Sequence, residues 1–438
     1  MRSGETIEVP DVQYALSGDV SIAYQVFGEG PALVFVPFFS NLYALWEFGP
    51  WARMCARLAS TRRVILVNPR GVGLSDRPRG FTVESRVDDI RAVMDAEDIT
   101  RAPLLAIGES SATSAVFAAS YPERVERLIL YVPSRRGVEQ AERAEALARL
   151  DEERSRWGRR DHLEEFARFM NPQWADDEDY VEWFVRQHRM ASSPGGWRDF
   201  QRMTIELDVT DVLAAVRVPT LVVSKERVRD TAEDVAGRIE GCELVIVPGE
   251  GFAIHENDFV VEAIDTFLAG ALQQTIPESV LVTLLFTDLV GSTERAAELG
   301  DRAWRELLAQ HHGIVRRELA RFRGVEVDTA GDGFLATFDG PARGIHAANA
   351  IVANVHELGL DVRAGLHTGE CELHEGKVAG IAVSLGARVS AEAAPGEVLV
   401  SSTVKDLVAG SGIEFEDRGL RELKGVPGEW RLYAVDSA

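Results

Sequence analysis

Short apolar runs of strand length alternate with helical stretches between Ala32 and Val247, and this alternation limits the possible folds more than any other feature of the chain. Strands that are apolar throughout and separated by helices indicate a parallel sheet covered by helices. The runs are Ala32 to Val36, Val64 to Val67, Leu104 to Ile107, Leu128 to Val132, Thr220 to Val223 and Leu244 to Val247. Each is too short to cross a membrane as a helix. We therefore predict an α/β domain and no membrane span.

Two breaks in the alternation divide the chain. From about 135 to 217 the sequence becomes charged, helical and tryptophan-bearing, which predicts a helical cap. Later, the polar segment QQTIPES has the character of a linker. We predict a first domain at 1–274, a linker at 275–279 and a second domain at 280–438. The second domain runs strand, helix, strand pair, helix, strand, a split βαβ order typical of an α+β, ferredoxin-like fold.

The charge balance argues against some partners. The chain has 47 Lys and Arg against 70 Asp and Glu, a net charge of −23. This balance disfavours nucleic acid and anionic membranes as partners and is compatible with recruiting divalent cations. The first residues contain no apolar leader segment, so we expect a cytoplasmic protein. The three cysteines are scattered without metal-ligand spacing and are expected to be reduced thiols.

Two lone aspartates stand at the ends of apolar, strand-like segments in the second domain. Asp288 lies in VLVTLLFTDLVGST and Asp332 in EVDTAGDGFLATF. Two carboxylates on neighbouring strand ends can bridge two divalent cations, which clamp the attacking and leaving oxygens in phosphoryl chemistry. Taken singly, each aspartate could simply cap a helix or a turn. Together they favour phosphoryl chemistry.

The first domain contains a sequence close to the G-x-S-x-G elbow, in which a strand turns sharply into a helix and exposes a serine. The segment LLAIGESSATSAVFAASYPERV carries Gly108, Ser110 and Ala112 at this spacing. Together with NPRGVGLS from Asn68, it resembles the α/β-hydrolase family across roughly residues 10–272. The resemblance implies an α/β-hydrolase fold with Ser110 at the nucleophile position.

The partners that such a serine needs are missing. The family's last motif has a histidine where PGEGFAI has Phe252, and the acid position falls on Arg227, with Glu226 or Asp230 as imperfect substitutes. Because a serine nucleophile requires a base, we expect a degenerate hydrolase site that serves as a scaffold or as a pocket for a small apolar ligand. Tryptophans of the cap would line such a pocket, although aromatic residues at helical spacing are more often core. These tryptophans are Trp174, Trp183 and Trp197.

Four motifs in the second domain resemble class III nucleotide cyclases: FTDLVGST, TAGDGF, AGIAVSLGARVSA and RELKGVPGEW. A hydrolase region ahead of such a domain also resembles an arrangement found in actinobacterial cyclases. The resemblance implies that Asp288 and Asp332 hold two Mg²⁺ or Mn²⁺ ions per site, with the backbone of Leu289 beside them. It also implies that a turn and a lysine bind the phosphates. These residues are Gly291, Ser292, Thr293 and Lys424.

The remaining positions of the cyclase pattern are only partly retained. Arg388 matches the arginine that stabilises charge on the α-phosphoryl group, whereas Ser384 replaces the asparagine that orients the ribose. At the two base-reading positions, usually a lysine and an aspartate or threonine, the chain has Asp328 and Lys377. Asp328 could accept hydrogen bonds from N1 and N2 of guanine while Lys377 donates one to O6, an arrangement that favours GTP. The resemblance to the family instead favours ATP. The two side chains could instead pair and close the pocket.

In this family the metal aspartates and the arginine come from different subunits, so the resemblance implies a homodimer with two composite sites. The sequence thus favours a nucleotide cyclase acting on ATP or GTP. Two alternatives stay open. One is a serine esterase or lipase that acts through Ser110. The other is a catalytically inactive nucleotide- or ligand-binding signalling module.

Overall fold

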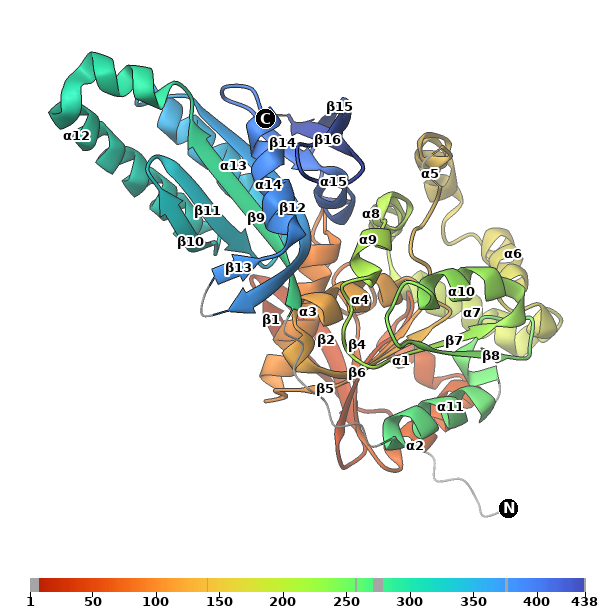
Figure 1. The fold of residues 1–438 in the computed structure, drawn as a ribbon. Coiled ribbons are helices and arrows are strands. Elements are labelled where there is room, and N and C mark those ends of the chain that lie inside the picture. Colours follow the sequence, from red (N-terminus) through yellow and green to blue (C-terminus); the bar gives the residue numbers. More distant parts are fainter. Residues whose placement is uncertain (1–7, 140, 257, 271–278, 375–376, 437–438) are drawn as a thin grey trace. The chain divides into compact units, whose positions relative to one another are not determined.

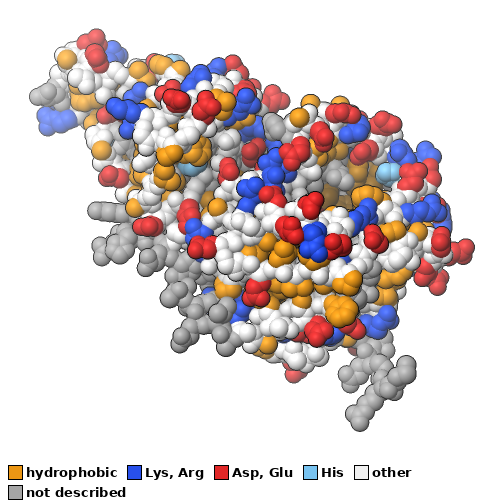
Figure 2. Space-filling view, turned by 45° about the vertical axis from the view of Figure 1, so that its right-hand side comes forward, with side chains coloured by type: hydrophobic (Ala, Val, Ile, Leu, Met, Phe, Trp, Pro, Cys, Tyr) orange, Lys and Arg blue, Asp and Glu red, His pale blue; other side chains and the backbone are white. Residues whose placement is uncertain are grey.

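The computed structural model describes residues 8–139, 141–256, 258–270, 279–374 and 377–436. The chain folds into two compact units, Met1–Pro277 and Glu278–Ala438, each with a sheet of its own. Among the helices of the described ranges, none combines the length and the apolar character needed to cross a membrane. Acidic and basic side chains interleave over the face shown in Figure 2, so no single patch on that face gathers the net charge.

The first unit is built on an eight-stranded sheet with the order β1-β2-β4-β3-β5-β6-β7-β8 (Figure 1). The strands are β1 Val12–Ser17, β2 Val20–Phe27, β3 Ala32–Val36, β4 Arg63–Val67, β5 Ala102–Ile107, β6 Val125–Tyr131, β7 Thr220–Lys225 and β8 Glu243–Val247. The strands from β4 to β8 along this order pair in parallel, and β1 and β2 extend the sheet antiparallel. The apolar runs of the sequence therefore form the parallel part of the sheet.

Helices connect these strands, and several form a cap between β6 and β7. They are α1 Leu42–Trp46, α2 Gly49–Ala59, α3 Val83–Ala96, α4 Ser110–Ser120, α5 Arg143–Arg156, α6 Arg160–Met170, α7 Glu178–Ala191, α8 Pro194–Glu206, α9 Thr210–Leu213, α10 Arg229–Ala236 and α11 Asp258–Ala269, with 3₁₀ turns η1 Pro122–Arg124, η2 Pro172–Trp174, η3 Glu226–Val228 and η4 Ile254–Glu256. In the cap, α5 packs on α8 and α6 on α7 (Figure 1). Buried aromatic residues join the cap to the sheet domain: Trp183 donates a hydrogen bond to the carbonyl oxygen of Ala44 at 2.7 Å.

The second unit forms its own mixed sheet, with the order β10-β11-β9-β12-β14-β16-β15 and β13 paired to β12. The strands are β9 Ser279–Leu289, β10 Val325–Ala330, β11 Gly333–Phe338, β12 Val362–His374, β13 Lys377–Ala379, β14 Val398–Ser401, β15 Phe415–Glu422 and β16 Glu429–Val435. The helices are α12 Ser292–Arg321, α13 Pro341–His356, α14 Ile381–Glu392 and α15 Ser402–Leu407. From β9 to β12 the connectivity and strand order are those of a split βαβ fold.

Glycines shape three local features of this unit. Gly291 has a φ of +66° immediately before α12, and Gly300 has a φ of +77° at a kink within α12. Gly331, with a φ of +66°, makes the tight turn between β10 and β11. Glycine adopts these left-handed conformations without the steric cost that other residues incur. The helix predicted after the first strand of this unit is therefore long and kinked.

Candidate functional site

The aspartate pair of the second unit lies where β9 meets the β10–β11 hairpin. Asp288 is next to last in β9, and Asp332 lies in the turn between the hairpin strands. In this register Thr287 is opposite Phe334. A Cβ built on Gly333 would lie 3.3 Å from the carbonyl oxygen of Thr287 and 3.8 Å from Oδ1 of Asp288. Because Gly333 has no side chain, the hairpin tip that carries Asp332 approaches the Asp288 carboxylate closely.

The two carboxylates have different partners. Oδ2 of Asp288 accepts from Nη2 of Arg363 at 2.5 Å and from Nε at 3.1 Å, across the β9–β12 pairing. Oδ2 of Asp332 is buried and accepts no hydrogen bond from the described residues. A buried oxygen without a partner is costly, and hard divalent cations prefer carboxylate oxygens. Asp288 and Asp332 therefore fit a divalent cation, although the described chain contains no cluster of three or more His, Cys, Asp or Glu that could hold one.

Two histidines of α12, which the motifs did not single out, face the same hairpin. Nε2 of His312 lies 3.0 Å from the carbonyl oxygen of Gly331. His311 is buried, and neither of its ring nitrogens has a hydrogen-bond partner within the described ranges. Burial, with a smaller contribution from His312, lowers the pKa of His311 to about 4, although Asp332 opposes the shift. His311 is therefore neutral at pH 7.

A cavity of about 300 Å³ brings together one metal candidate, Asp288, and one base-reading candidate, Asp328. Asp288, Asp328 and Arg363 line it, and α14 contributes Ala387 and Ser390. Oδ1 of Asp328 accepts a hydrogen bond from the backbone N–H of Thr329 at 2.9 Å. The backbone of Lys377 lies in β13, but its side chain is outside the described part of the structure. The pairing of Asp328 with Lys377 therefore stays a prediction.

The other predicted cyclase residues form a second group. Ser384 and Arg388 are exposed one turn apart on α14, and Nε of Arg388 donates to the carbonyl oxygen of Lys424 at 3.0 Å. Lys424 is also exposed, in the segment between β15 and β16. Among the described residues that line the cavity beside Asp288, none of these three is present. Within one chain, Ser384, Arg388 and Lys424 therefore do not line the cavity that Asp288 lines, although Ala387 of the same helix does.

The predicted phosphate turn begins a helix. Leu289 is buried as the last residue of β9, and Ser292 and Thr293 open α12 after Gly291. The backbone N–H groups of a first helical turn have no partners within the helix, and the positive end of the helix dipole lies there. This is the usual geometry of a phosphate site at a helix N-terminus.

In the first unit, the elbow has a different residue at its apex from the one that the sequence indicated. Gly108 follows β5 with a φ of +59°, and Ser110 is already the first residue of α4. The Ser110 side chain is buried, and its Oγ donates to the carbonyl oxygen of Pro37 at 2.9 Å. The strained strand-to-helix position, where a hydrolase presents its nucleophile, is therefore held by glycine. Assigning Ser110 to this position is corrected because the strand ends two residues earlier.

Arg227 and Phe252 lie together at the positions expected for the acid and the base. The Arg227 guanidinium carbon is 4.8 Å from the centroid of the Phe252 ring and 4.6 Å from that of Phe169. Nη1 of Arg227 also donates to the carbonyl oxygen of Phe169 at 2.7 Å. A cation–π contact thus replaces an acid–histidine pair, and neither side chain can accept a proton.

His255 is enclosed by aromatic rings. It stacks on Trp174 with ring centroids 5.4 Å apart and meets Phe48 and Trp51 edge-on. Both ring nitrogens are buried, with no hydrogen-bond partner among residues that the structure describes. Burial, with smaller contributions from Arg53 and Lys225, lowers the pKa of His255 to about 3. His255 is held neutral and does not compensate for the missing base.

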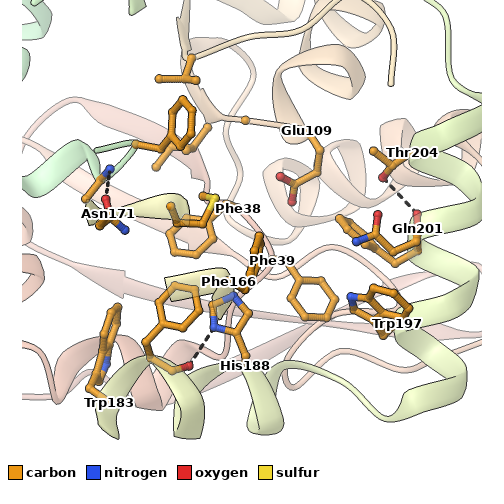
Figure 3. A pocket seen from close by; sticks show the side chains of 18 of the residues that line it. Phe38, Phe39, Glu109, Phe166, Asn171, Trp183, His188, Trp197, Gln201 and Thr204 are labelled. Atoms are coloured by element: carbon orange, nitrogen blue, oxygen red, sulfur yellow. Dashed lines mark hydrogen bonds between the residues drawn. The ribbon is translucent and has the colours of Figure 1, made fainter. Parts of the chain in front are cut away.

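An apolar cavity of about 340 Å³ lies beneath the cap (Figure 3). Gly108 and Glu109 line it at the elbow, and Trp183 and Trp197 line it from the cap. Trp174 is not among the described residues that line it, since its ring stacks on His255 instead. The motifs also missed Glu109, whose acidic side chain the G-x-S-x-G pattern leaves unspecified.

Comparison with known proteins assigns a family to each unit. The model of the alpha/beta hydrolase family matches residues 33–263, and that of the adenylate and guanylate cyclase catalytic domain matches residues 275–437. A pH-sensitive adenylate cyclase from Mycobacterium tuberculosis is 26% identical over 174 residues, covering 38% of this chain and 43% of that protein. A 2-hydroxy-6-oxo-2,4-heptadienoate hydrolase from Pseudomonas putida is 31% identical over 117 residues, covering 26% of this chain and 42% of that protein.

The chain spans less than half the length of each of these two relatives. It spans 16% of an uncharacterized protein from Rhizobium meliloti that is 32% identical over 167 residues. Among solved structures, an enol-lactonase from Burkholderia xenovorans is similar with a TM-score of 0.51 and 19% identity, covering 59% of this chain and 100% of that chain. At this identity the similarity concerns the fold alone.

Proposed function

The chain belongs to the α/β-hydrolase family over residues 33–263 and carries an adenylate/guanylate cyclase catalytic domain at residues 275–437, and from these assignments we propose that the protein is a purine nucleotide cyclase. It would convert ATP or GTP to the 3′,5′-cyclic monophosphate and pyrophosphate. The observation that carries this proposal is the approach of the Asp332 turn to Asp288, with a buried carboxylate oxygen of Asp332 left without a partner. The hydrolase-like unit would regulate or assemble the enzyme.

Asp288 and Asp332 would bind the divalent cations, with the backbone of Leu289 beside them. Two bound Mg²⁺ or Mn²⁺ ions would neutralise triphosphate charge and favour ionisation of the ribose 3′-hydroxyl. The N–H groups of Gly291, Ser292 and Thr293 would hold phosphate oxygens at the start of α12.

The second group of residues would act on the other side of the nucleotide. Arg388 would stabilise the charge that develops on the α-phosphoryl group, and Lys424 would bind the terminal phosphates. Ser384, one turn from Arg388, would hydrogen-bond the ribose directly or through water.

The basic test measures cyclic nucleotide formed from ATP and from GTP, each with Mg²⁺ and with Mn²⁺. Wild type should form product, and Asp288→Ala should remove it. Exposed Arg302, which pairs with Glu306 on α12, provides a matched control: Arg302→Ala should leave turnover unchanged. Tight nucleotide binding by wild type without any product would favour the inactive signalling module and would overturn the cyclase proposal.

The choice of base would depend on Asp328 and Lys377. An acceptor at 328 and a donor at 377 complement guanine, whereas the opposite arrangement complements adenine. We therefore expect a preference for GTP that moves toward ATP in the double variant Asp328→Lys, Lys377→Asp. The measurement is the ratio of kcat/KM for the two nucleotides. A wild type that prefers ATP, with no change on exchange, would contradict this assignment.

The active site would be shared between two copies of the chain. Support comes from Arg388 and Lys424, which contact each other and are not among the described residues that line the cavity beside Asp288. Mixing an Asp288→Ala chain with an Arg388→Ala chain should restore one intact site per dimer, although each variant alone is inactive. If both variants fold and dimerise but the mixture recovers no turnover, the shared site is wrong.

The hydrolase-like unit would lack ester hydrolysis. Glycine stands at the elbow apex, where the nucleophile is expected, and Arg227 and Phe252 stand in contact where the acid and the base are expected. Wild type should therefore show no turnover of a short-chain aryl ester above that of Ser110→Ala. Ester turnover that disappears in Ser110→Ala would instead support the esterase alternative.

A further inference from the structure

The apolar cavity beneath the cap contains a single carboxylate among its described lining residues, that of Glu109. Glu109 directly follows the elbow apex, and Figure 3 shows its carboxylate directed into the cavity, on the side opposite His188. Its surroundings are largely aromatic, including Phe39, Trp197 and Phe200. At about 340 Å³, the cavity lies at the small end of the range for ligand pockets.

The Glu109 carboxylate occupies the place where a hydrolase stabilises an oxyanion. The backbone N–H groups of Glu109 itself and of Phe39 are near enough to the carboxyl group to lower its pKa. In an active α/β-hydrolase, the N–H of the residue after the nucleophile and an N–H of the loop after the third strand form the oxyanion hole. Phe39 lies in that loop, between β3 and α1. These two N–H groups therefore lie near a carboxyl group of the protein itself.

This charge is only partly compensated by the protein. Burial raises the pKa of Glu109 to about 7, although the two N–H groups and Arg86 oppose the shift. Arg86, from α3, lies between the rings of Phe81 and Phe200, 5.0 and 5.2 Å from their centroids. It is not among the described residues that line the cavity. At pH 8 Glu109 thus presents a carboxylate to an apolar space, which is costly without a donor or cation.

Two other polar side chains of the cavity, His188 and Thr204, can accept hydrogen bonds from a ligand. Nδ1 of His188 lies 2.8 Å from the carbonyl oxygen of Phe184 and donates a hydrogen bond to it. In a neutral ring, Nε2 is then left as a hydrogen-bond acceptor. Burial lowers the pKa of His188 to about 4, so the ring is neutral. Oγ1 of Thr204 donates to the carbonyl oxygen of Phe200 at 3.0 Å, which leaves its lone pairs available. A ligand rich in donors complements such a lining.

We propose that this cavity binds a lipophilic primary amine, with the protonated nitrogen paired to Glu109 and the apolar body packed among the aromatic rings of the cap. The ammonium supplies three donors where the lining supplies acceptors, and aromatic faces attract cations. The inference is independent of the cyclase proposal because it depends only on residues of the first unit.

The test titrates the full-length protein with n-octylamine, n-octanol and octanoate at pH 8 and follows tryptophan fluorescence, since Trp157, Trp183 and Trp197 line the cavity. Octylamine should bind roughly ten- to a hundredfold more tightly than octanol, because the charged hydrogen bond is present only in the amine. Octanoate, which repeats the charge of Glu109, should bind most weakly. Equal binding of amine and octanoate would overturn the proposal.

Variants separate the carboxylate from the apolar contacts. Glu109→Gln keeps the shape of the side chain and should lose the advantage of octylamine while retaining octanol binding. Glu182→Gln is the matched control, because Glu182 is exposed on cap helix α7 and pairs with Arg160; it should leave all three affinities unchanged. An unchanged octylamine affinity in a folded Glu109→Gln protein would refute the role of Glu109.

A measurement on wild type alone keeps the proposal testable if Glu109→Gln does not fold. Lowering the pH from 8 to 6 protonates Glu109, while octylamine stays charged, so octylamine affinity should fall and octanol affinity should not. The charged neighbour of Glu109 is Arg86, and the other titratable groups on the cavity are His188, His255 and Tyr180. The pKa values of both histidines are lowered to about 4 or below, and burial raises the pKa of Tyr180. None of these groups titrates in this interval, so an octylamine affinity that does not change with pH would contradict the proposal.

Discussion

Replacing Arg363 with alanine is expected to raise the affinity of the protein for divalent cations. Two nitrogens of Arg363 bond the same oxygen of Asp288, at 2.5 and 3.1 Å, so a cation that uses this carboxylate competes with the guanidinium. The Arg363 and Asp288 side chains are 37% and 39% exposed, and an ion pair this open to water contributes roughly 0.2–1 kcal/mol. Removing the competitor should therefore raise cation affinity roughly 1.4- to 5-fold.

The assay is calorimetric titration of the full chain with Mn²⁺ in the absence of nucleotide. Arg302→Ala serves as the control, because Arg302 is 91% exposed and pairs with Glu306 away from the hairpin, and its affinity for Mn²⁺ should equal that of wild type. If Arg363→Ala binds Mn²⁺ more weakly than wild type while its thermal unfolding is unchanged, Arg363 orients Asp288 for the cation, and the competition argument is refuted.

Three further predictions concern stability. A Cβ at Gly365 would lie 2.1 Å from the backbone nitrogen of Ser390, whereas one at Gly313 meets nothing within 4 Å. In urea unfolding, Gly365→Ala should lower the free energy of unfolding by roughly 1–3 kcal/mol, and Gly313→Ala, within a helix, should raise it by roughly 0.5–1 kcal/mol. Equal effects of the two substitutions would contradict the packing at Gly365. Arg70→Ala leaves the fully buried carboxylate of Asp89 without its ion-pair partner, so the free energy of unfolding should fall by roughly 3–5 kcal/mol; a change within about 0.5 kcal/mol, as at ordinary surface sites, would show that the pair is not buried in solution. Because burial raises the pKa of Glu109 from 4.5 to about 7, the folded state binds the proton more tightly than the unfolded state. As the pH rises from about 4.5 to 7, the free energy of unfolding of wild type should therefore fall by on the order of 3 kcal/mol relative to that of Glu109→Gln. A stability difference that is the same at both pH values would argue against a buried acid.

The fold of each unit was accessible from local sequence patterns. The predicted classes, an α/β-hydrolase fold followed by a class III cyclase fold, are confirmed by the family matches. The apolar runs became strands because segments that are buried on both faces must be apolar at every position. The replacement of an acid–base pair by Arg227 and Phe252 was also readable, because each position follows its strand at a short, fixed distance. The structure adds that these two side chains contact each other.

The elbow shows where local patterns fail. The segment Gly-Glu-Ser-Ser-Ala matches the spacing of G-x-S-x-G, but the spacing alone does not say where the strand ends. The pairing of Ile107 with Tyr131 keeps β5 extended up to Gly108, and Gly108 rather than Ser110 therefore takes the left-handed conformation. His311 was missed for a related reason: its proximity to Asp332 depends on how α12 packs over the hairpin, and a helix sequence does not specify its neighbours.

The sequence by itself determined the two folds, the candidate metal aspartates and the residues at the positions expected for a hydrolase acid and base, because these depend on the order of residue types within single strands and turns. Tertiary structure alone decided that Glu109 would lie near the N–H of Phe39, that Asp332 would keep a buried oxygen without a partner among the described residues, and that Arg388 would contact Lys424. Each of these outcomes joins segments that are distant in the chain. Contacts of that kind are set by sheet register and by the packing of helices on the sheet, which no short motif encodes.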